Sequence, residues 1–244
     1  MIELTVARLT ARVLLGRRRI LFFFVFPALV VGLAALVRVL SDQPVAGTAS
    51  VVGTFGFVTL LPVLCVVAGT GVIGPEIEDG SIIYLLAKPV RRSSIVAAKL
   101  VVAVLTCLCF GTGSILAAGL VGSGSLDGAP ITFAMASVLA IVAYCSVFLL
   151  LAVATRHAVV IGIAYALVWE SLIGSFLPGV RNLSIQQWSL SLTDQLLGRS
   201  ARFGDLVSPS IGAGTAAVLV LLVTVAATWL STQRLRSLRM TDAG

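Results

Sequence analysis

Residues 131–155 read ITFAMASVLAIVAYCSVFLLLAVAT, a run of 25 residues without a charged side chain. About 20 helical residues cross the roughly 30 Å of hydrocarbon in a bilayer, so this run is long enough to span a membrane. A helix also satisfies its backbone hydrogen bonds internally, as a lipid environment requires. The run therefore indicates an α-helical membrane protein.

The composition of the whole chain supports this interpretation. Of 244 residues, 59% are hydrophobic and only 11% are charged, and the mean hydropathy is +1.11. Soluble domains carry about 25% charged residues, so this chain could not cover its surface with polar groups in water. We expect an all-α membrane protein with one transmembrane domain, 1–244. Its six expected spans are approximately 20–40, 50–74, 95–121, 131–155, 158–177 and 211–230.

The positions of the basic residues predict the orientation. Six spans place both termini on one side, and that side then holds 13 of the 17 Lys and Arg residues. Because cytoplasmic segments carry the excess of Lys and Arg, we expect both termini in the cytoplasm and a multi-pass protein of the cell membrane. The sequence pI of about 9.9 is thus a topology signal, and no nucleic-acid partner is expected.

The segment before the first span, 1–19, has an amphipathic pattern. Apolar residues recur at helical spacing at Ile2, Val6, Leu9 and Val13. This pattern predicts an interfacial helix on the cytoplasmic leaflet, close to anionic headgroups. The basic residues expected to hold it there are Arg8, Arg12, Arg17, Arg18 and Arg19. The alternative is a topology signal without a further role.

The segment 178–209 is too polar to span a membrane and too apolar to be a plain loop. We expect a re-entrant outer segment before the last span, with one or two short helices. Its Trp188 is expected at headgroup depth, because tryptophan is enriched at membrane interfaces.

The join between the second and third spans, residues 76–92, reads EIEDGSIIYLLAKPVRR and gathers three acids and two arginines, residue types that its flanks lack. The acids Glu76, Glu78 and Asp79 favour the N-terminus of a helix that follows. Residues 81–88 provide two helical turns, and Pro89 ends them. The sequence predicts a short ordered helix in the cytoplasm rather than a flexible loop.

This short helix carries apolar residues on the water side of the membrane, which favours a protein partner. The alternative is that it packs against the interfacial helix of the same chain. The pattern Glu76-x-x-x-Gly80-Ser81-x-x-x-Leu85-Leu86-x-x-Pro89 resembles the first cytoplasmic loop of type-2 ABC-transporter permeases of the exporter type. Ser81 stands where that family often has Thr. The six spans, the N-terminal helix and the outer segment are similar as well.

The resemblance implies a coupling helix that docks on a separate ATPase subunit. It implies two ATPase copies, a second permease copy or a paralogous permease, and a lipid bilayer as partners. ATP and Mg²⁺ are expected in the ATPase, with no cofactor bound by this chain. The coupling residues it implies are Glu76, Glu78, Asp79, Gly80, Ser81, Ile82, Leu85, Leu86, Lys88, Pro89, Arg91 and Arg92.

The chain itself shows no phosphate-binding motif. The nearest candidate, GTGVIG at 69–74, is followed by Pro75 and Glu76 instead of the Lys and Ser/Thr of a P-loop. We interpret these small residues as a close helix contact. Paired catalytic carboxylates and a nucleophile with its base are also missing from the sequence, so we do not expect an enzyme. His157 is interpreted as a solvated loop residue.

The four cysteines, Cys65, Cys107, Cys109 and Cys145, all fall inside expected spans. None has a His or a second Cys at metal-ligand spacing, and the pattern does not suggest disulfides. We expect small core residues and no metal site.

Glu170, in YALVWESLIG, is the charge within the fifth expected span. An intramembrane carboxyl is costly in lipid, so it should face a bundle interior or an interface. Two interpretations stay open: a polar group lining a substrate path or gate, or a structural hydrogen bond between helices. The residues of this candidate path are Glu170, Trp169, Ser171 and Tyr165.

The leading hypothesis is a membrane-spanning permease subunit of an ATP-driven type-2 ABC exporter, with hydrolysis in a separate subunit. The alternative is an ATP-independent carrier or channel that uses Glu170. A third hypothesis is a membrane anchor or sensor that recruits a cytoplasmic partner. The apolar spans suit lipids, drugs, peptides and lipid-linked sugars equally well, so the sequence does not indicate the substrate.

Overall fold

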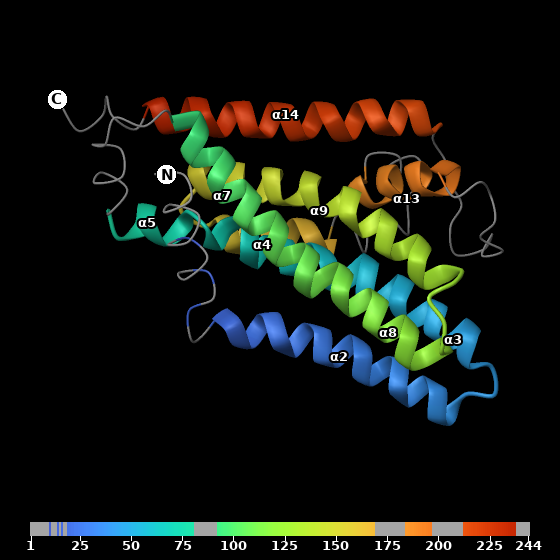
Figure 1. Ribbon diagram of the computed structural model, residues 1–244. Helices are drawn as coiled ribbons and strands as arrows, with labels where there is room; N and C mark the ends of the chain where they lie inside the picture. Colours follow the sequence, from blue (N-terminus) through green and yellow to red (C-terminus); the bar gives the residue numbers. More distant parts are fainter. Residues whose placement is uncertain are drawn as a thin grey trace.

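The computed structural model describes residues 10, 14, 16, 19–80, 92–168, 184–196 and 212–237. Every regular element in these ranges is a helix (Figure 1). The elements are α2 (Arg19–Leu40), α3 (Pro44–Ser50), the π-helical stretch η1 (Val51–Leu60), α4 (Leu61–Gly71), α5 (Gly74–Glu78), α7 (Arg92–Cys107), the π-helical stretch η2 (Leu108–Thr112), α8 (Gly113–Ser123), α9 (Ala129–Ala154), α10 (Ala158–Ala164), α13 (Ile185–Leu196) and α14 (Ala213–Ser237).

Five of the six expected spans coincide with helices long and apolar enough to cross a membrane. They are Ile20–Leu40, Pro44–Ile77, Arg92–Ser123, Ala129–Ala154 and Ala213–Leu235. The fifth expected span is described only as a shorter apolar helix, Ala158–Val168, and its remainder lies outside the described residues. The second span begins earlier than expected, because Pro44 at the helix start has the backbone angle that a first turn needs.

The expected interfacial helix falls mostly outside the described residues. Arg8, Arg12, Arg17 and Arg18 are not described, and Arg19 is the first residue of α2, of which only the backbone is described. That helix stays a prediction.

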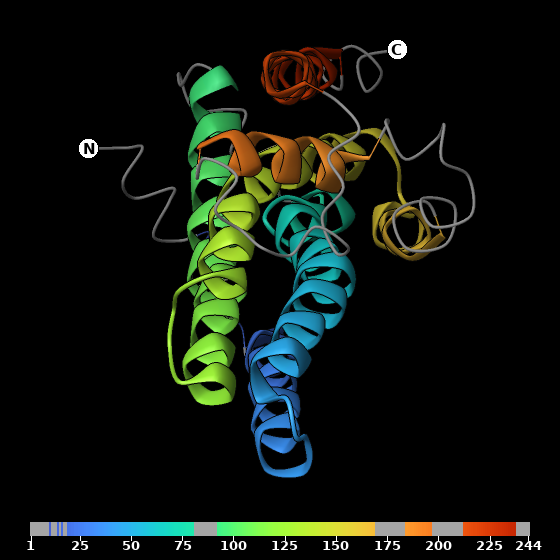
Figure 2. The same ribbon diagram turned by 90° about the vertical axis from the view of Figure 1, so that its right-hand side faces the viewer.

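The centre of the bundle is α9, which packs against α4, α13 and α14. Over the most apolar 18 residues of α9, 67% of the residues are buried, whereas the same fraction is 17% in α2 and 17% in α14. These two helices lie at opposite edges of the bundle in both ribbon views (Figures 1 and 2). Helix α2 packs against α8, on the side of the bundle away from α14.

Small residues let α4 and α9 approach closely. A Cβ on Gly69 would lie 2.8 Å from the Cβ of Phe148 and 3.3 Å from the carbonyl oxygen of Cys145. On α9, Ala136, Ala140 and Ala143 are fully buried. Such small-residue contacts allow van der Waals packing between membrane helices, so the interpretation of 69–74 as a helix contact is confirmed at Gly69.

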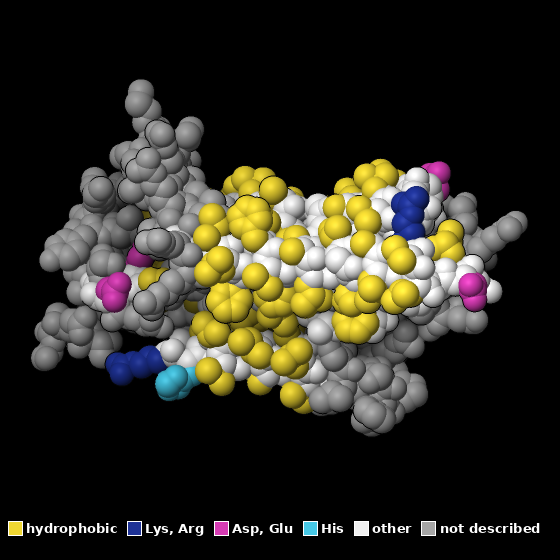
Figure 3. All heavy atoms as spheres, turned by 90° about the horizontal axis from the view of Figure 1, so that it is seen from below, with side chains coloured by type: hydrophobic (Ala, Val, Ile, Leu, Met, Phe, Trp, Pro, Cys, Tyr) yellow, Lys and Arg dark blue, Asp and Glu magenta, His cyan; other side chains and the backbone are white. Residues whose placement is uncertain are grey.

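The surface between the two ends of the bundle is apolar. Figure 3 shows charged side chains at the two ends of the molecule and hydrophobic side chains between them. Exposed apolar residues on α14 include Leu221, Leu222 and Val225. His157 is exposed beside Arg156 at the turn after α9, as the sequence predicted. A surface of this kind suits a bilayer as the surrounding solvent.

Helix α13 confirms a helical element within the expected outer segment, and it packs against α9 and α14. The position expected for Trp188 needs correction: its side chain is only 6% exposed, so the indole packs inside the protein rather than against headgroups. The amphipathic pattern that suggested an interface reflects packing on neighbouring helices. Buried Ser189 and Thr193 donate to carbonyls of α13 itself, which satisfies their hydroxyls.

Candidate functional site

Lys99, in α7, is the fully buried cation at the end of the bundle where α5 lies. Its Nζ donates to the carbonyl oxygen of Val72 at 2.5 Å and to Oε1 of Glu76 at 2.7 Å. These bonds join α7 to the end of the second span and to α5. The side chain of Glu76 is 26% exposed, so the carboxylate lies at the edge of the buried region.

The local fold explains why a cation belongs there. Helix α4 ends at Gly71, so the Val72 carbonyl lacks an intrahelical partner and lies at the negative end of the helix dipole. The separate helix α5 begins at Gly74; Pro75, which has no N–H, and Glu76 both lie in its first turn. A buried ammonium is unfavourable unless it is paired and hydrogen-bonded. Lys99 meets both conditions.

Arg92, the first residue of α7, makes a second bond of the same kind. Its Nη1 donates to the carbonyl oxygen of Leu235 at 2.8 Å, in the last turn of α14. Helix α7 thus holds the C-terminal ends of both α4 and α14. Figure 1 shows α5, the start of α7 and the end of α14 at the same end of the molecule.

At the opposite end, Arg38 at the end of α2 donates from Nη1 to the carbonyl oxygen of Val121 at 2.7 Å, in the last turn of α8. The same chemistry operates at both ends, because the last carbonyls of a helix accept cations readily. At the α5 end, however, a single helix, α7, supplies two such cations, Lys99 and Arg92. We call Lys99, Arg92, Val72, Glu76 and Leu235 the α7 anchor.

The structure describes part of the expected coupling segment. Glu76 belongs to the α7 anchor. The helix whose N-terminus it was expected to favour lies outside the described residues, so that role stays a prediction. Asp79 is exposed, and Gly80 has a φ of +69°, a left-handed conformation that ends α5 and favours glycine. Glu78 ends α5. Ser81, Ile82, Leu85, Leu86, Lys88, Pro89 and Arg91 lie outside the described residues, and their roles stay predictions.

Of the candidate substrate path, the structure describes Tyr165 alone. Its ring lies 6.2 Å from that of Phe148 in an edge-to-face arrangement, so Tyr165 packs against α9. Trp169, Glu170 and Ser171 lie outside the described residues. Both interpretations of Glu170 therefore stay open.

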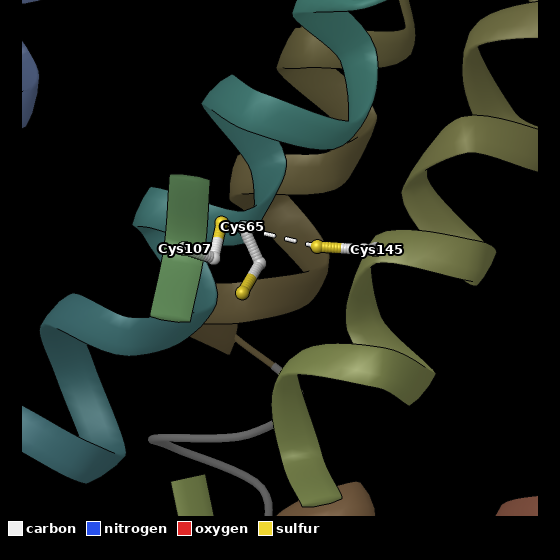
Figure 4. Close-up of side chains that lie close together, drawn as sticks. All are labelled: Cys65, Cys107 and Cys145. Atoms are coloured by element: carbon white, nitrogen blue, oxygen red, sulfur yellow. Dashed lines mark hydrogen bonds between the residues drawn. The ribbon is translucent and has the colours of Figure 1, made fainter. Parts of the chain in front are cut away.

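Three cysteines from three helices meet in the core of the bundle (Figure 4). Cys65 of α4, Cys107 of α7 and Cys145 of α9 are each 0% exposed, and their sulfur atoms all lie within 4.8 Å of one another. We expected all four cysteines to be buried in the core. These three are buried, whereas Cys109 is exposed. The sequence spacing shows no metal-ligand pattern, yet helix packing brings these three distant positions together. The expectation of no metal site stays a prediction.

Long apolar helices and an apolar surface between two polar ends define a multi-pass α-helical membrane protein. Residues 15–177, which are 163 of the 244 residues, match the model of the ABC-2 family transporter protein family. The chain belongs to this family, and the resemblance carried by its cytoplasmic loop is confirmed. The family is a membrane component of transport and is not itself the ATPase. No curated protein matched the sequence.

Sequence reasoning missed Lys99 as a site residue. A lysine inside an otherwise uncharged span was the available signal, since a cation there needs a partner. Its partners Val72 and Glu76 are 27 and 23 residues away in the chain, so spacing alone could not identify them. The three cysteines gave a weaker signal, because each lies on a different span.

Proposed function

We propose that this chain is the membrane-spanning permease subunit of an ATP-driven exporter. A separate ABC ATPase binds and hydrolyses ATP with Mg²⁺, and its movement drives the permease. Membership of the ABC-2 family supports this function. Two permease chains, identical or paralogous, pair with two ATPase copies in the plasma membrane, with the α5 end of the bundle in the cytoplasm.

The segment from Glu76 to Arg92 is the docking site for the ATPase in this proposal. The α7 anchor is the observation that carries it, because it fixes both ends of this segment to membrane helices. Lys99 holds Glu76 and the end of α4, and Arg92 holds the end of α14. Charge-assisted hydrogen bonds are shorter and stronger than neutral ones, so they suit the transmission of a displacement.

In this proposal, the contacts of α7 define the path by which movement of the ATPase reaches the other membrane helices. A displacement of the docking segment moves α7, and the two cations pass the movement to α4 and α14. Both helices pack against α9, which also contacts α13. The movement therefore extends from the cytoplasmic end toward the outer segment, where the substrate leaves the bundle.

The docking step is tested by association. The wild-type chain and a Leu85→Asp/Leu86→Asp variant are purified gently from native membranes, and the proteins that accompany them are identified. We expect an ATP-hydrolysing subunit with the wild-type chain and its loss from the variant. The control is Leu126→Asp, a single Leu→Asp change in the exposed loop at the opposite end. Retention of the ATPase by the double variant would contradict the docking site.

A further inference from the structure

The three-cysteine cluster, Cys65, Cys107 and Cys145, has no role in the coupling proposed above. Cys107 is 15 residues from the start of α7, and Cys145 is 9 residues before the end of α9. At about 1.5 Å per helical residue, these positions lie roughly 22 and 14 Å from the α5 end of their helices. The cluster therefore lies deep within a hydrocarbon layer of about 30 Å.

The sulfur positions fit a single central atom. The Sγ atoms of Cys107 and Cys145 are 3.8 Å apart, and the three Sγ atoms lie within 4.8 Å of one another. Thiolates bind zinc at about 2.3 Å, and three sulfurs at that distance with bond angles of about 100–120° lie about 3.5–4.0 Å apart. The cluster reaches this geometry if its widest pair closes by up to about 1 Å.

The softness of the thiolate ligands and the net charge of the occupied site indicate which ion this cluster would bind. Thiolate ligands select soft ions and disfavour Mg²⁺ and Ca²⁺, which prefer oxygen. Each cysteine binds as a thiolate and brings one negative charge. A monovalent ion would leave a net charge of −2 at the site, and a divalent ion −1. Net charge deep in a membrane is strongly unfavourable, so a trivalent ion is favoured because it leaves the site neutral.

We propose that Cys65, Cys107 and Cys145 form a binding site for a soft trivalent metalloid, specifically trivalent arsenic. Arsenous acid, As(OH)₃, condenses with three thiols to give As(SR)₃ and three molecules of water. Three As–O bonds and three S–H bonds are replaced by three As–S bonds, and each hydroxide leaves as water with a thiol proton. Arsenic stays in its trivalent state, and both reactant and product are neutral.

The test uses the purified wild-type chain, reduced with a phosphine that is then removed, with sodium arsenite as the probe. Bound arsenic per chain is counted, and X-ray absorption at the arsenic edge identifies the neighbouring atoms. We expect one arsenic per chain with three sulfur neighbours and no oxygen. Cadmium serves as the divalent comparator, and we expect it to be displaced by an equal concentration of arsenite.

Substitutions assign the sulfur neighbours. Cys65→Ser, Cys107→Ser and Cys145→Ser should each lose the three-sulfur signal. Cys109→Ser is the matched control, because Cys109 is exposed and lies two residues from Cys107; it should bind arsenic as the wild type does. The wild-type spectrum needs no variant, so a variant that fails to fold leaves the test intact. Absence of bound arsenic in the reduced wild type, oxygen neighbours, cadmium that resists displacement, or an unchanged signal in Cys145→Ser would overturn the proposal.

Discussion

Lys99 and Glu76 join the two helices on either side of residues 81–91. The Nζ atom of Lys99 in α7 lies 2.7 Å from Oε1 of Glu76 in α5. The same ammonium also donates to the carbonyl oxygen of Val72, directly after α4. The described residues on either side of 81–91 are therefore tied to the bundle by one ion pair and by Arg92. In the proposed function, a partner docked on this segment acts directly on α4 and α14 through these contacts.

The two partners of this ion pair should differ in their effect on stability. In Glu76→Ala, the buried ammonium of Lys99 loses its counter-charge, and we expect a loss of about 3 kcal/mol in the free energy of unfolding. In Lys99→Met, an apolar side chain of similar length replaces the buried charge, and the 26% exposed Glu76 can be hydrated. Such replacements are often neutral, so we expect a change below about 1 kcal/mol.

Denaturant unfolding in mixed micelles measures both changes. Asp79→Asn is the matched control, because Asp79 is exposed on the same short segment. Equal losses in Glu76→Ala and Lys99→Met would contradict the asymmetry that the burial of Lys99 predicts.

Arg92→Gln should weaken the contact between α7 and α14. It removes a charge-assisted hydrogen bond of 2.8 Å to the Leu235 carbonyl from a half-buried position, and we expect a loss of about 1 to 2 kcal/mol. Arg156→Gln makes the same chemical change at an exposed position after α9 and should stay within about 0.5 kcal/mol of wild type. Thermal unfolding of the three proteins in one detergent gives the comparison. Identical melting temperatures would show that the Arg92 bond does not hold α14.

Gly69→Ala tests the close contact between α4 and α9. The added Cβ would meet the Cβ of Phe148 at 2.8 Å and the Cys145 carbonyl oxygen at 3.3 Å, so the helices must separate. Overpacking of this kind costs about 1–3 kcal/mol. Gly74→Ala is the control, since an added Cβ there meets nothing within 4 Å. A stability of Gly69→Ala equal to that of Gly74→Ala would show that the contact is loose.

Gln186→Leu tests how α13 is held in the bundle. Nε2 of Gln186 donates to the carbonyl oxygen of Val58 in η1 at 2.9 Å, and the side chain is 4% exposed. Hydrogen bonds between membrane helices contribute about 0.6–2 kcal/mol, so we expect a loss of that size. The control Gln233→Leu changes an exposed glutamine of α14 and should leave unfolding unchanged. Protease cleavage within 184–196 should also rise in Gln186→Leu, and unchanged cleavage would argue against the anchoring role.

Five of the six expected spans coincide with long apolar helices, because long uncharged runs leave lipid as the only suitable surroundings. The predicted runs 20–40 and 131–155 match Ile20–Leu40 and Ala129–Ala154 closely. The start of the second span was predicted less well, since Pro44 and small residues extend the helix beyond its most apolar part. Helix α13 was expected, but its burial depends on packing against α9 and α14.

The candidate site was predictable only in its location. The charged stretch 76–92 indicated where the site lies, and its first and last residues, Glu76 and Arg92, do contact the bundle. The partner of Glu76 could not be predicted from spacing, because Lys99 lies on the next span and helix packing decides which face meets α5. The same limit applies to Cys65, Cys107 and Cys145, whose proximity depends on the relative rotation of three helices.

The most direct test of coupling through α7 measures movement at the end of the bundle opposite the ATPase. In a Cys109→Ser background, spin labels are placed at the exposed positions Ser125 and Thr215, and their distance is measured in the complex with the co-purified ATPase. We predict that ATP with vanadate changes this distance in the wild type. In Lys99→Met the complex should assemble normally and the distance should stay fixed. A nucleotide-driven change in Lys99→Met equal to that of the wild type, or a wild-type chain that purifies without an ATPase, would contradict the account.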